Sequence, residues 1–198
     1  LINHAIDFAR NFASDENICL STDSDEIIDC AINNNLKVPF KRPDVLSSDT
    51  ANSNEVILHA INYYESKGKC FDLLVLLQPT TPFRKKEDLK NMLNQWNTNI
   101  DLMVSVKEPH DSPYFNIYEE NSTNFLIKSK ESKSTRRQDA PKVYAINGSL
   151  YIYNIKSLKN KAVNKIKKYV MKDPLYSIDI DNQLDWLIAE TIINNKLI

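Results

Sequence analysis

The feature that most constrains the fold is an alternation of strand-like and helix-like segments along nearly the whole chain. The run DLLVLLQ at 72–78 is almost continuously apolar, which is typical of a central strand covered on both faces. We predict helices at 1–12, 25–33, 54–67, 85–96 and 183–194, and strands at 18–22, 37–40, 101–107, 145–155, 169–171 and 176–180. This order indicates an α/β fold with a mostly parallel sheet between layers of helices.

The composition argues against several classes of function. Of the 198 residues, 42% are apolar and 26% are charged, and the net charge is −1, so we expect neither a nucleic-acid nor a membrane partner. No apolar run reaches the roughly 20 residues that cross a bilayer. The three cysteines are scattered and lack CxxC spacing, which favours reduced thiols and a cytoplasmic location. The three histidines form no zinc-ligand pattern.

Two parts of the chain depart from the regular pattern. It opens within an amphipathic helix, so we expect a strand and turn upstream of Leu1, and its two glycines are too few for a Gly-rich phosphate loop. Residues 108–142 are polar, with short candidate strands at 114–118 and 125–128. Charged runs such as KSKESKSTRRQ are usually solvated loops or linkers. We expect this segment to leave the sheet as a hairpin or an arm.

Polar side chains stand where two of the predicted strands end. Thr22 and Asp23 end the first strand, and Gln78, Thr80 and Thr81 follow DLLVLL in a loop that two prolines stiffen. Open α/β sheets bind ligands at the carboxyl ends of their strands. Each group taken alone is also compatible with a turn or a helix cap.

Basic residues form two further candidate clusters. Arg42 precedes a loop that ends at Ser53, where a helix cap is the simpler interpretation. Arg136 and Arg137 form a pair that suits a carboxylate or phosphate ligand. Gly148, inside a strand pattern, indicates a bulge or a close approach.

The stretch YSIDIDNQLDW at 176–186 places Asp179 and Asp181 two residues apart. In a strand both carboxylates lie on one face, so the stretch is either an ordinary half-buried strand or a metal-binding pair. We expect its apolar residues and those of the closing helix to be core: Ile178, Ile180, Leu184, Trp186 and Leu187. No Ser-His-Asp or Cys-His arrangement is present, so covalent catalysis is not expected.

Five motifs, taken in order, resemble those of the acylneuraminate cytidylyltransferase family, which contains the CMP-sialic acid synthetases. They cover nearly the whole chain: STDSDEI, VPFKRPDVLSSDTANS, LLVLLQPTTPFR, RRQDAPKVYAINGSLYIY and SIDIDNQLD. The resemblance implies a Rossmann-like, three-layer nucleotidyltransferase fold in a single domain, 1–198, with 108–142 as an arm used for dimerisation. It also implies transfer of CMP from CTP to a nine-carbon acid sugar, with release of pyrophosphate and with Mg²⁺ as cofactor.

The resemblance also assigns roles to individual residues. Asp179 and Asp181 would bind Mg²⁺, Asp181 more directly, and Asp181, Arg136 and Arg137 would be the catalytic residues, the arginines acting on the sugar carboxylate or the phosphates. The nucleotide would contact Arg42, Ser53, Thr22 and Asp23. The ribose and the sugar would contact Gln78, Thr80, Thr81, Asn147 and Tyr151.

Two departures from the family leave alternatives open. The family's N-terminal signature, close to ARxGSKxxxxKN, would lie upstream of Leu1, so we expect residues 1–198 alone to bind CTP poorly and turn over little. The segments at 114–116 and 162–165 differ from some sialic-acid members, which admits legionaminic, pseudaminic or another acid sugar, including 3-deoxy-manno-octulosonate. A non-catalytic binding domain is the alternative from another class.

Overall fold

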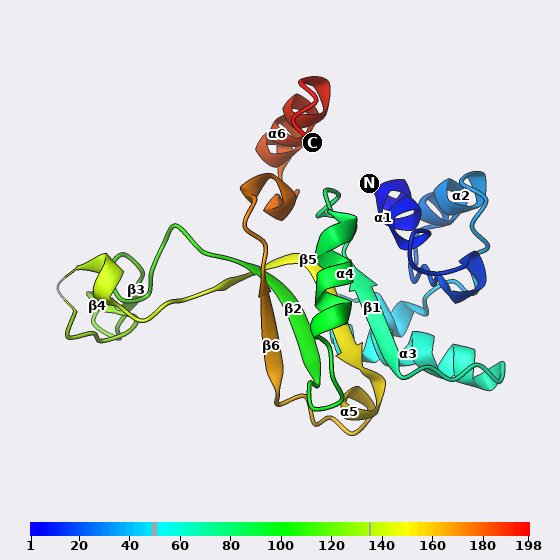
Figure 1. Cartoon of the computed structure of the whole chain (residues 1–198), viewed down its shortest axis with the longest axis horizontal. Helices are drawn as coiled ribbons and strands as arrows, with labels where there is room; N and C mark the ends of the chain where they lie inside the picture. The colour runs from blue at the N-terminus through cyan, green and yellow to red at the C-terminus, as the bar shows by residue number, and fades with distance from the viewer. Residues whose placement is uncertain (49–50, 135) are drawn as a thin grey trace.

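The computed structural model describes residues 1–48, 51–134 and 136–198, and its centre is a four-stranded sheet in the order β1-β5-β2-β6 (Figure 1). These strands are β1 (Leu73–Leu77), β2 (Leu102–Lys107), β5 (Ala145–Asn154) and β6 (Ile166–Val170). β5 is antiparallel to both β1 and β2, whereas β6 is parallel to β2. Three strands therefore share one direction, as the α/β alternation predicts, and β5 runs against them.

Helices cover both faces of this sheet, which confirms the layered α/β fold. The helices of the described residues are α1 (Ile2–Ala9), α2 (Asp25–Asn33), α3 (Ser53–Ser66), α4 (Lys86–Gln95), α5 (Ile155–Lys159) and α6 (Gln183–Asn194), of which α2 and α6 pack away from the sheet. On one face α3 and α5 pack on alternate residues of β2, in a cluster of Ile57, Ile61, Leu158, Val104 and Val106. On the other face α1 and α4 pack on the opposite residues, in a cluster of Phe8, Leu89, Met92, Met103 and Ile152.

The prediction that 72–78 is covered on both faces is confirmed, since Leu74 and Leu76 pack on one face and Leu73 and Leu77 on the other, but the prediction that it is a central strand is wrong for the described residues. β1 lies at one edge of the sheet and pairs only with β5. Its residues are half-buried, and the side chain of Val75 is 37% exposed. An apolar run indicates that both faces of a strand pack against other residues, but it does not specify the strand's position in the sheet.

The two short N-terminal segments predicted as strands, 18–22 and 37–40, are extended but join no sheet. They run beside each other, with the Arg42 amide donating to the Thr22 carbonyl at 2.8 Å. Ile18, Leu20 and Val38 pack instead against α1 and α2. Strand assignment needs a hydrogen-bonded ladder, and composition alone does not supply one.

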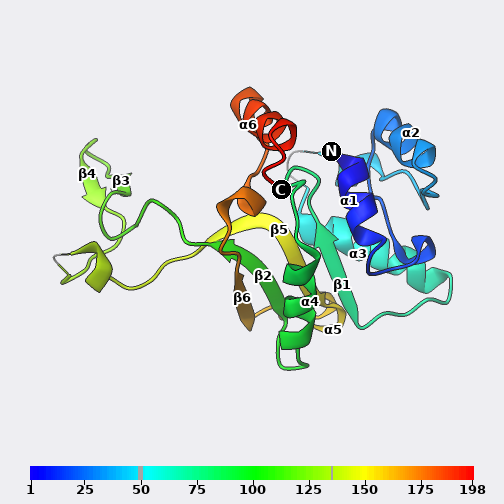
Figure 2. The same cartoon turned by 45° about the horizontal axis from the view of Figure 1, so that its top comes forward.

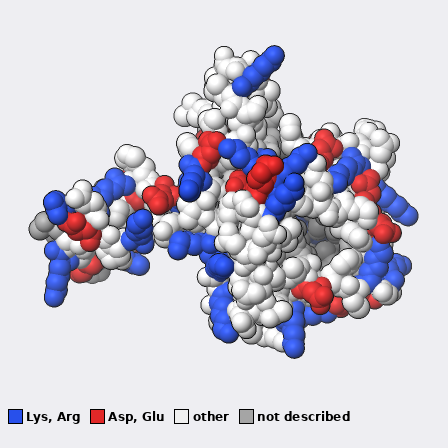
Figure 3. Space-filling view, viewed as in Figure 1, with Lys and Arg blue, Asp and Glu red and all other residues white. Residues whose placement is uncertain are grey.

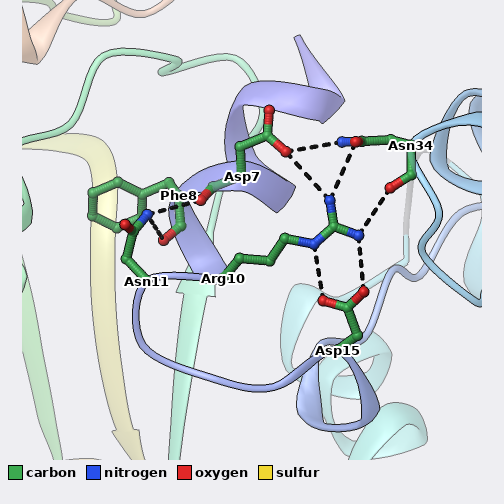
Figure 4. A network of polar contacts seen from close by, with 6 residues as sticks. All are labelled: Asp7, Phe8, Arg10, Asn11, Asp15 and Asn34. Atoms are coloured by element: carbon green, nitrogen blue, oxygen red, sulfur yellow. Dashed lines mark hydrogen bonds and ion pairs between the residues drawn. The ribbon is translucent and has the colours of Figure 1, made fainter.

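A polar network fixes α1 to the turn after α2 (Figure 4). The Arg10 guanidinium donates two bonds of 2.9 Å to Asp15 and one of 2.8 Å to the Asn34 carbonyl. Asn34 in turn donates to Asp7 at 3.0 Å. This planar fork is a geometry that arginine provides and lysine does not.

Residues 108–134 and 136–142 project away from the sheet as an arm in both views (Figures 1 and 2). The arm carries a small antiparallel hairpin of β3 (Tyr118–Glu120) and β4 (Leu126–Lys128). All residues of both strands are exposed. Its basic and acidic side chains are intermixed (Figure 3).

The prediction of a strand at 176–180 is wrong. Pro174–Ser177 form a 3₁₀ turn, η4, because Asp173 caps its first amide and Pro174 presets its backbone. Residues 178–181 then run extended without joining the sheet. The other 3₁₀ turns are η1 (Asp15–Asn17), η2 (Asp44–Leu46) and η3 (Arg137–Asp139).

The expected packing of this region is partly wrong. Ile178 and Ile180 do contact the buried cluster of Phe83, Ala189 and Ile192. Leu184, Trp186 and Leu187 instead lie on the open side of α6, exposed by 65%, 39% and 51%. No helix among the described residues is both long and apolar enough to cross a membrane.

Candidate functional site

The loop after β1 is held against β5 by a buried threonine. Thr81 is fully buried, and its hydroxyl lies 3.1 Å from the Gln78 carbonyl and 3.0 Å from the Gly148 carbonyl. It was expected to contact substrate, but its side chain faces the interior and joins the two segments. Gln78 itself is exposed and Thr80 is half-buried, so these two are available to a ligand.

Gly148 lies in a bulge of β5, as its position in the strand pattern indicates. Val104 pairs with Tyr151 and Val106 with Ile146, so Ser105 alone faces residues 147–150. The φ angle of Gly148 is +72°, which an L side chain rarely adopts. A Cβ atom there would lie 2.8 Å from Gln78 Oε1 and 3.3 Å from Asp179 Oδ2. Gln78 and Asp179 therefore converge on the bare backbone of Gly148.

The extended segment after η4 brings Asp179 to this point. The Ile180 amide donates to the Thr80 carbonyl at 2.9 Å, which ties the segment to the loop after β1. Oδ1 of Asp179 is buried and has no hydrogen-bond partner among the described residues. Burying a carboxylate oxygen without a partner is unfavourable, so this atom is a candidate to bind a cation or a hydrogen-bond donor.

The two aspartates differ in their surroundings. Asp181 is exposed, and its backbone amide donates to Asp185 at the start of α6. The oxygens of Asp179 and Asp181 fit Mg²⁺, which typically takes one or two carboxylates and completes its shell with water and phosphate oxygens. The described residues contain no group of three potential metal-ligating side chains, so the remaining ligands would come from substrate and water.

Tyr151 borders the same site from β5. Its hydroxyl lies 3.4 Å from Gln78 Oε1. Burial raises the pKa of Tyr151, and the negative charge of Asp179 raises it further. The tyrosine therefore stays a neutral hydrogen-bonding group.

Asn147 is buried beneath the candidate site and links the bulge of β5 to neighbouring segments by hydrogen bonds. Its side chain is buried and donates to Ser177 Oγ at 2.8 Å and to Met171 Sδ at 3.1 Å, and its Oδ1 is 2.6 Å from Ser105 Oγ. A sugar would reach this amide only after those bonds broke. The network instead links the bulge of β5 to η4 and so to Asp179. Nothing in the sequence pattern singled out Ser177.

The expected nucleotide contacts form a second group. Arg42 donates to Asp23 at 2.6 Å and to the Ser47 hydroxyl at 3.1 Å. The hydrogen bond from Arg42 to Asp23 is the main cause that lowers the pKa of Asp23. Thr22 is buried and accepts from the Ser24 amide at 3.2 Å. Ser53 is the first residue of α3 and is exposed, and Asn52 rather than Ser53 caps that helix.

The structure does not bring the arginine pair to Gly148 within one chain. Arg136 pairs with Asp139 at 2.8 Å, and Arg137 donates to the carbonyl of His110. The turn η3 that contains Arg137 lies out on the arm, away from the sheet (Figures 1 and 2).

Comparisons with known proteins support one family. The model of a cytidylyltransferase family matches residues 1–194. A relative from Campylobacter coli, named post-translational flagellin modification protein B, is 34% identical over 99% of this chain and 85% of its own length. A CMP-N,N′-diacetyllegionaminic acid synthase of Campylobacter jejuni is 35% identical over 99% and 85%. An N-acylneuraminate cytidylyltransferase of Streptococcus agalactiae is 27% identical over 94% of this chain and 45% of its own length.

A solved structure has the same fold. It is the 4-diphosphocytidyl-2C-methyl-D-erythritol synthase of Anaerococcus prevotii, with a TM-score of 0.64, 12% identity, and cover of 96% of this chain and 84% of that one. These findings confirm the family resemblance and the nucleotidyltransferase fold expected from the motifs.

Proposed function

Because this chain belongs to the cytidylyltransferase family, we propose that it activates a nonulosonic, sialic-type acid sugar with CTP and releases pyrophosphate. The observation that carries the proposal is the convergence of Gln78 and Asp179 on Gly148, with the Tyr151 hydroxyl next to Gln78 and a buried Asp179 oxygen that has no partner among the described residues. The anomeric hydroxyl of the sugar would attack the α-phosphorus in line. The bond from the α-phosphorus to the bridging oxygen would break, pyrophosphate would leave with that electron pair, and the proton of the attacking hydroxyl would pass to solvent.

The residues of this chain would divide the work. Asp179 and Asp181 would hold Mg²⁺, which supplies charge neutralisation at the phosphates when bound. Gln78, Thr80 and Tyr151 would orient the ribose and the sugar. Arg42, with Asp23, Thr22 and Ser53, would contact the cytidine end.

Among acid sugars, N,N′-diacetyllegionaminic acid is the first to test. The relatives named for it are 35% and 29% identical to this chain, two relatives named for pseudaminic acid are both 30% identical, and one named for N-acylneuraminate is 27% identical. Full-length protein would be incubated with CTP, Mg²⁺ and a panel of legionaminic, pseudaminic, N-acetylneuraminic and 3-deoxy-manno-octulosonic acids, and pyrophosphate release measured. Pyrophosphate released with none of these sugars refutes the proposal.

We propose further that residues 1–198 by themselves bind CTP weakly. The outer edge of β1 has no strand partner among the described residues, and Ser21 Oγ and His59 Nδ1 are buried without partners. Calorimetric titration of CTP into this chain, and into any longer product of the same gene, compares the two. Equal affinity refutes the proposal.

We also propose that the arm serves a second copy of the chain. Ile117, Tyr118, Phe125, Leu126 and Ile127 are between 41% and 71% exposed, and an isolated two-stranded hairpin is only marginally stable. A second copy would cover this surface and receive the arginine pair at its own Asp179 site.

Mixing two inactive variants tests this exchange. If Asp179 and Arg137 of one site come from different subunits, dimers of Asp179→Ala with Arg137→Ala contain one intact site. Random exchange would then restore about a quarter of the wild-type activity, since half of the dimers are mixed. No recovery, despite dimers in light scattering, places both residues in the same subunit.

A further inference from the structure

Arg84 is a buried arginine outside the residues assigned to the reaction. It follows the loop after β1 and is only 9% exposed. The described residues place no carboxylate within ion-pair distance of its guanidinium. Burial lowers its pKa to about 10, so the group remains charged at neutral pH. A buried cation without an anionic partner is unfavourable for stability, so the role of Arg84 is sought in the hydrogen bonds that it makes.

The guanidinium joins the two segments that form the site. Nε donates to the Ser149 carbonyl at 3.1 Å, directly after Gly148. Nη2 donates to the Gln78 carbonyl and, at 3.2 Å, to the Thr81 hydroxyl. One planar group thus spans the loop after β1 and the bulge of β5. The Phe8 ring of α1 lies 5.8 Å from its centre and limits its movement.

The hydrogen bonds of Arg84 lie where a small displacement of the backbone would move the Gln78 side chain relative to Gly148. The Gln78 amide oxygen lies so close to Gly148 that a single carbon atom placed there would be 2.8 Å away. If the backbone of Gln78 moved relative to Ser149, its side chain would lose its place beside Asp179 and Tyr151.

We infer that Arg84 is a positioning residue for the transfer reaction, which acts through Gln78 by fixing the loop after β1 to the bulge of β5. This inference rests on the proposed function. Lysine would keep the charge but could not span three acceptors, because its donors radiate from one point.

The test compares two identical substitutions, Arg84→Lys and Arg10→Lys. Arg10 also makes a fork of hydrogen bonds, but it lies in the network between α1 and α2 (Figure 4). Both variants should melt at lower temperature. In full-length protein at a temperature where both are folded, Arg84→Lys should lower kcat about 100-fold, as expected for misplacement by about 1 Å, with KM nearly unchanged. Arg10→Lys should keep the wild-type kcat.

A double-mutant cycle with Gln78→Ala separates positioning from a general loss of structure. If Arg84 acts through Gln78, adding Arg84→Lys to Gln78→Ala lowers kcat little further. Additive losses, or a wild-type kcat for Arg84→Lys, overturn the inference.

An NMR measurement that does not depend on catalytic turnover tests this inference separately from the proposed function. The side-chain amide of Gln78, identified by its absence from Gln78→Ala, should give a dispersed ¹⁵N signal in the wild type and an averaged one in Arg84→Lys. An unchanged amide signal in Arg84→Lys refutes the positioning role even if the wild type transfers no nucleotide. Absent pyrophosphate release in the wild type, together with the expected amide change, refutes only the proposed function.

Discussion

Replacing Gly148 by alanine should separate the stability of the fold from the geometry of the site. Gly68 is the matched control, because its φ of +77° resembles the +72° of Gly148 but no atom lies within 4 Å of its added Cβ. Both substitutions force alanine into the left-handed region, at about 1–2 kcal/mol. For a domain of this size that corresponds to a fall in Tm of roughly 2–8 °C.

Only Gly148→Ala also meets the site. Its Cβ would lie 2.8 Å from Gln78 Oε1 and 3.3 Å from Asp179 Oδ2, and the exposed Gln78 side chain can swing away. The added destabilisation should therefore be modest, about 1–3 kcal/mol as for other overpacked positions. The displaced amide and carboxylate should lower turnover about 100-fold.

The assay pairs thermal unfolding with the initial rate of pyrophosphate release, measured at a temperature where both variants are folded. Gly68→Ala should keep the wild-type rate. If Gly148→Ala is as active as Gly68→Ala, then Gln78 and Asp179 are not held at a reacting centre, and the site has been assigned wrongly.

Three further experiments test the site and the fold. Asp179→Asn keeps the shape but removes the charge from a buried oxygen without a partner, so turnover should fall at least about 100-fold while Tm does not fall; retained activity contradicts the metal role. Asp23→Asn should flatten the acid side of the Tm–pH curve, because the bond from Arg42 lowers the pKa of Asp23. The contribution of this bond to the stability of the fold is complete above the usual pKa of 3.8 and is lost as the pH falls through the lowered pKa. An unchanged acid limb would show that this ion pair does not stabilise the fold. Ile192→Ala should destabilise the protein by about 2–5 kcal/mol in denaturant unfolding, whereas Leu187→Ala on the open side of α6 should change it by about 0.5 kcal/mol or less; equal losses would mean that α6 packs through its other face.

The local elements of the fold were predictable because they depend on neighbours in sequence. The helix predicted at 25–33 is α2, Asp25–Asn33, where Ser24 caps the first turn by accepting from the Ile27 amide. The strand predicted at 101–107 is β2, Leu102–Lys107. In both, side-chain periodicity and capping act within a few residues.

The errors concern partners that lie far away in the sequence. Residues 18–22 have strand composition, yet whether they form a strand depends on a ladder that no local pattern specifies. The same limitation applies to predicting the burial of the apolar residues of α6. Periodicity indicates that Leu187 lies on an apolar face of the helix, but it does not identify what that face packs against.

The sequence by itself determined the α/β class and the family, and it predicted candidate site residues such as Gln78 and Asp179, because motif order and the residues at strand ends can be read along the chain. Only the tertiary structure decided how those groups meet. The bulge of β5 places bare backbone at Gly148, and Arg84 and Thr81 bind the loop to it across more than sixty residues of sequence. Such contacts depend on strand register and burial, which are settled by packing of the whole core and have no local signature.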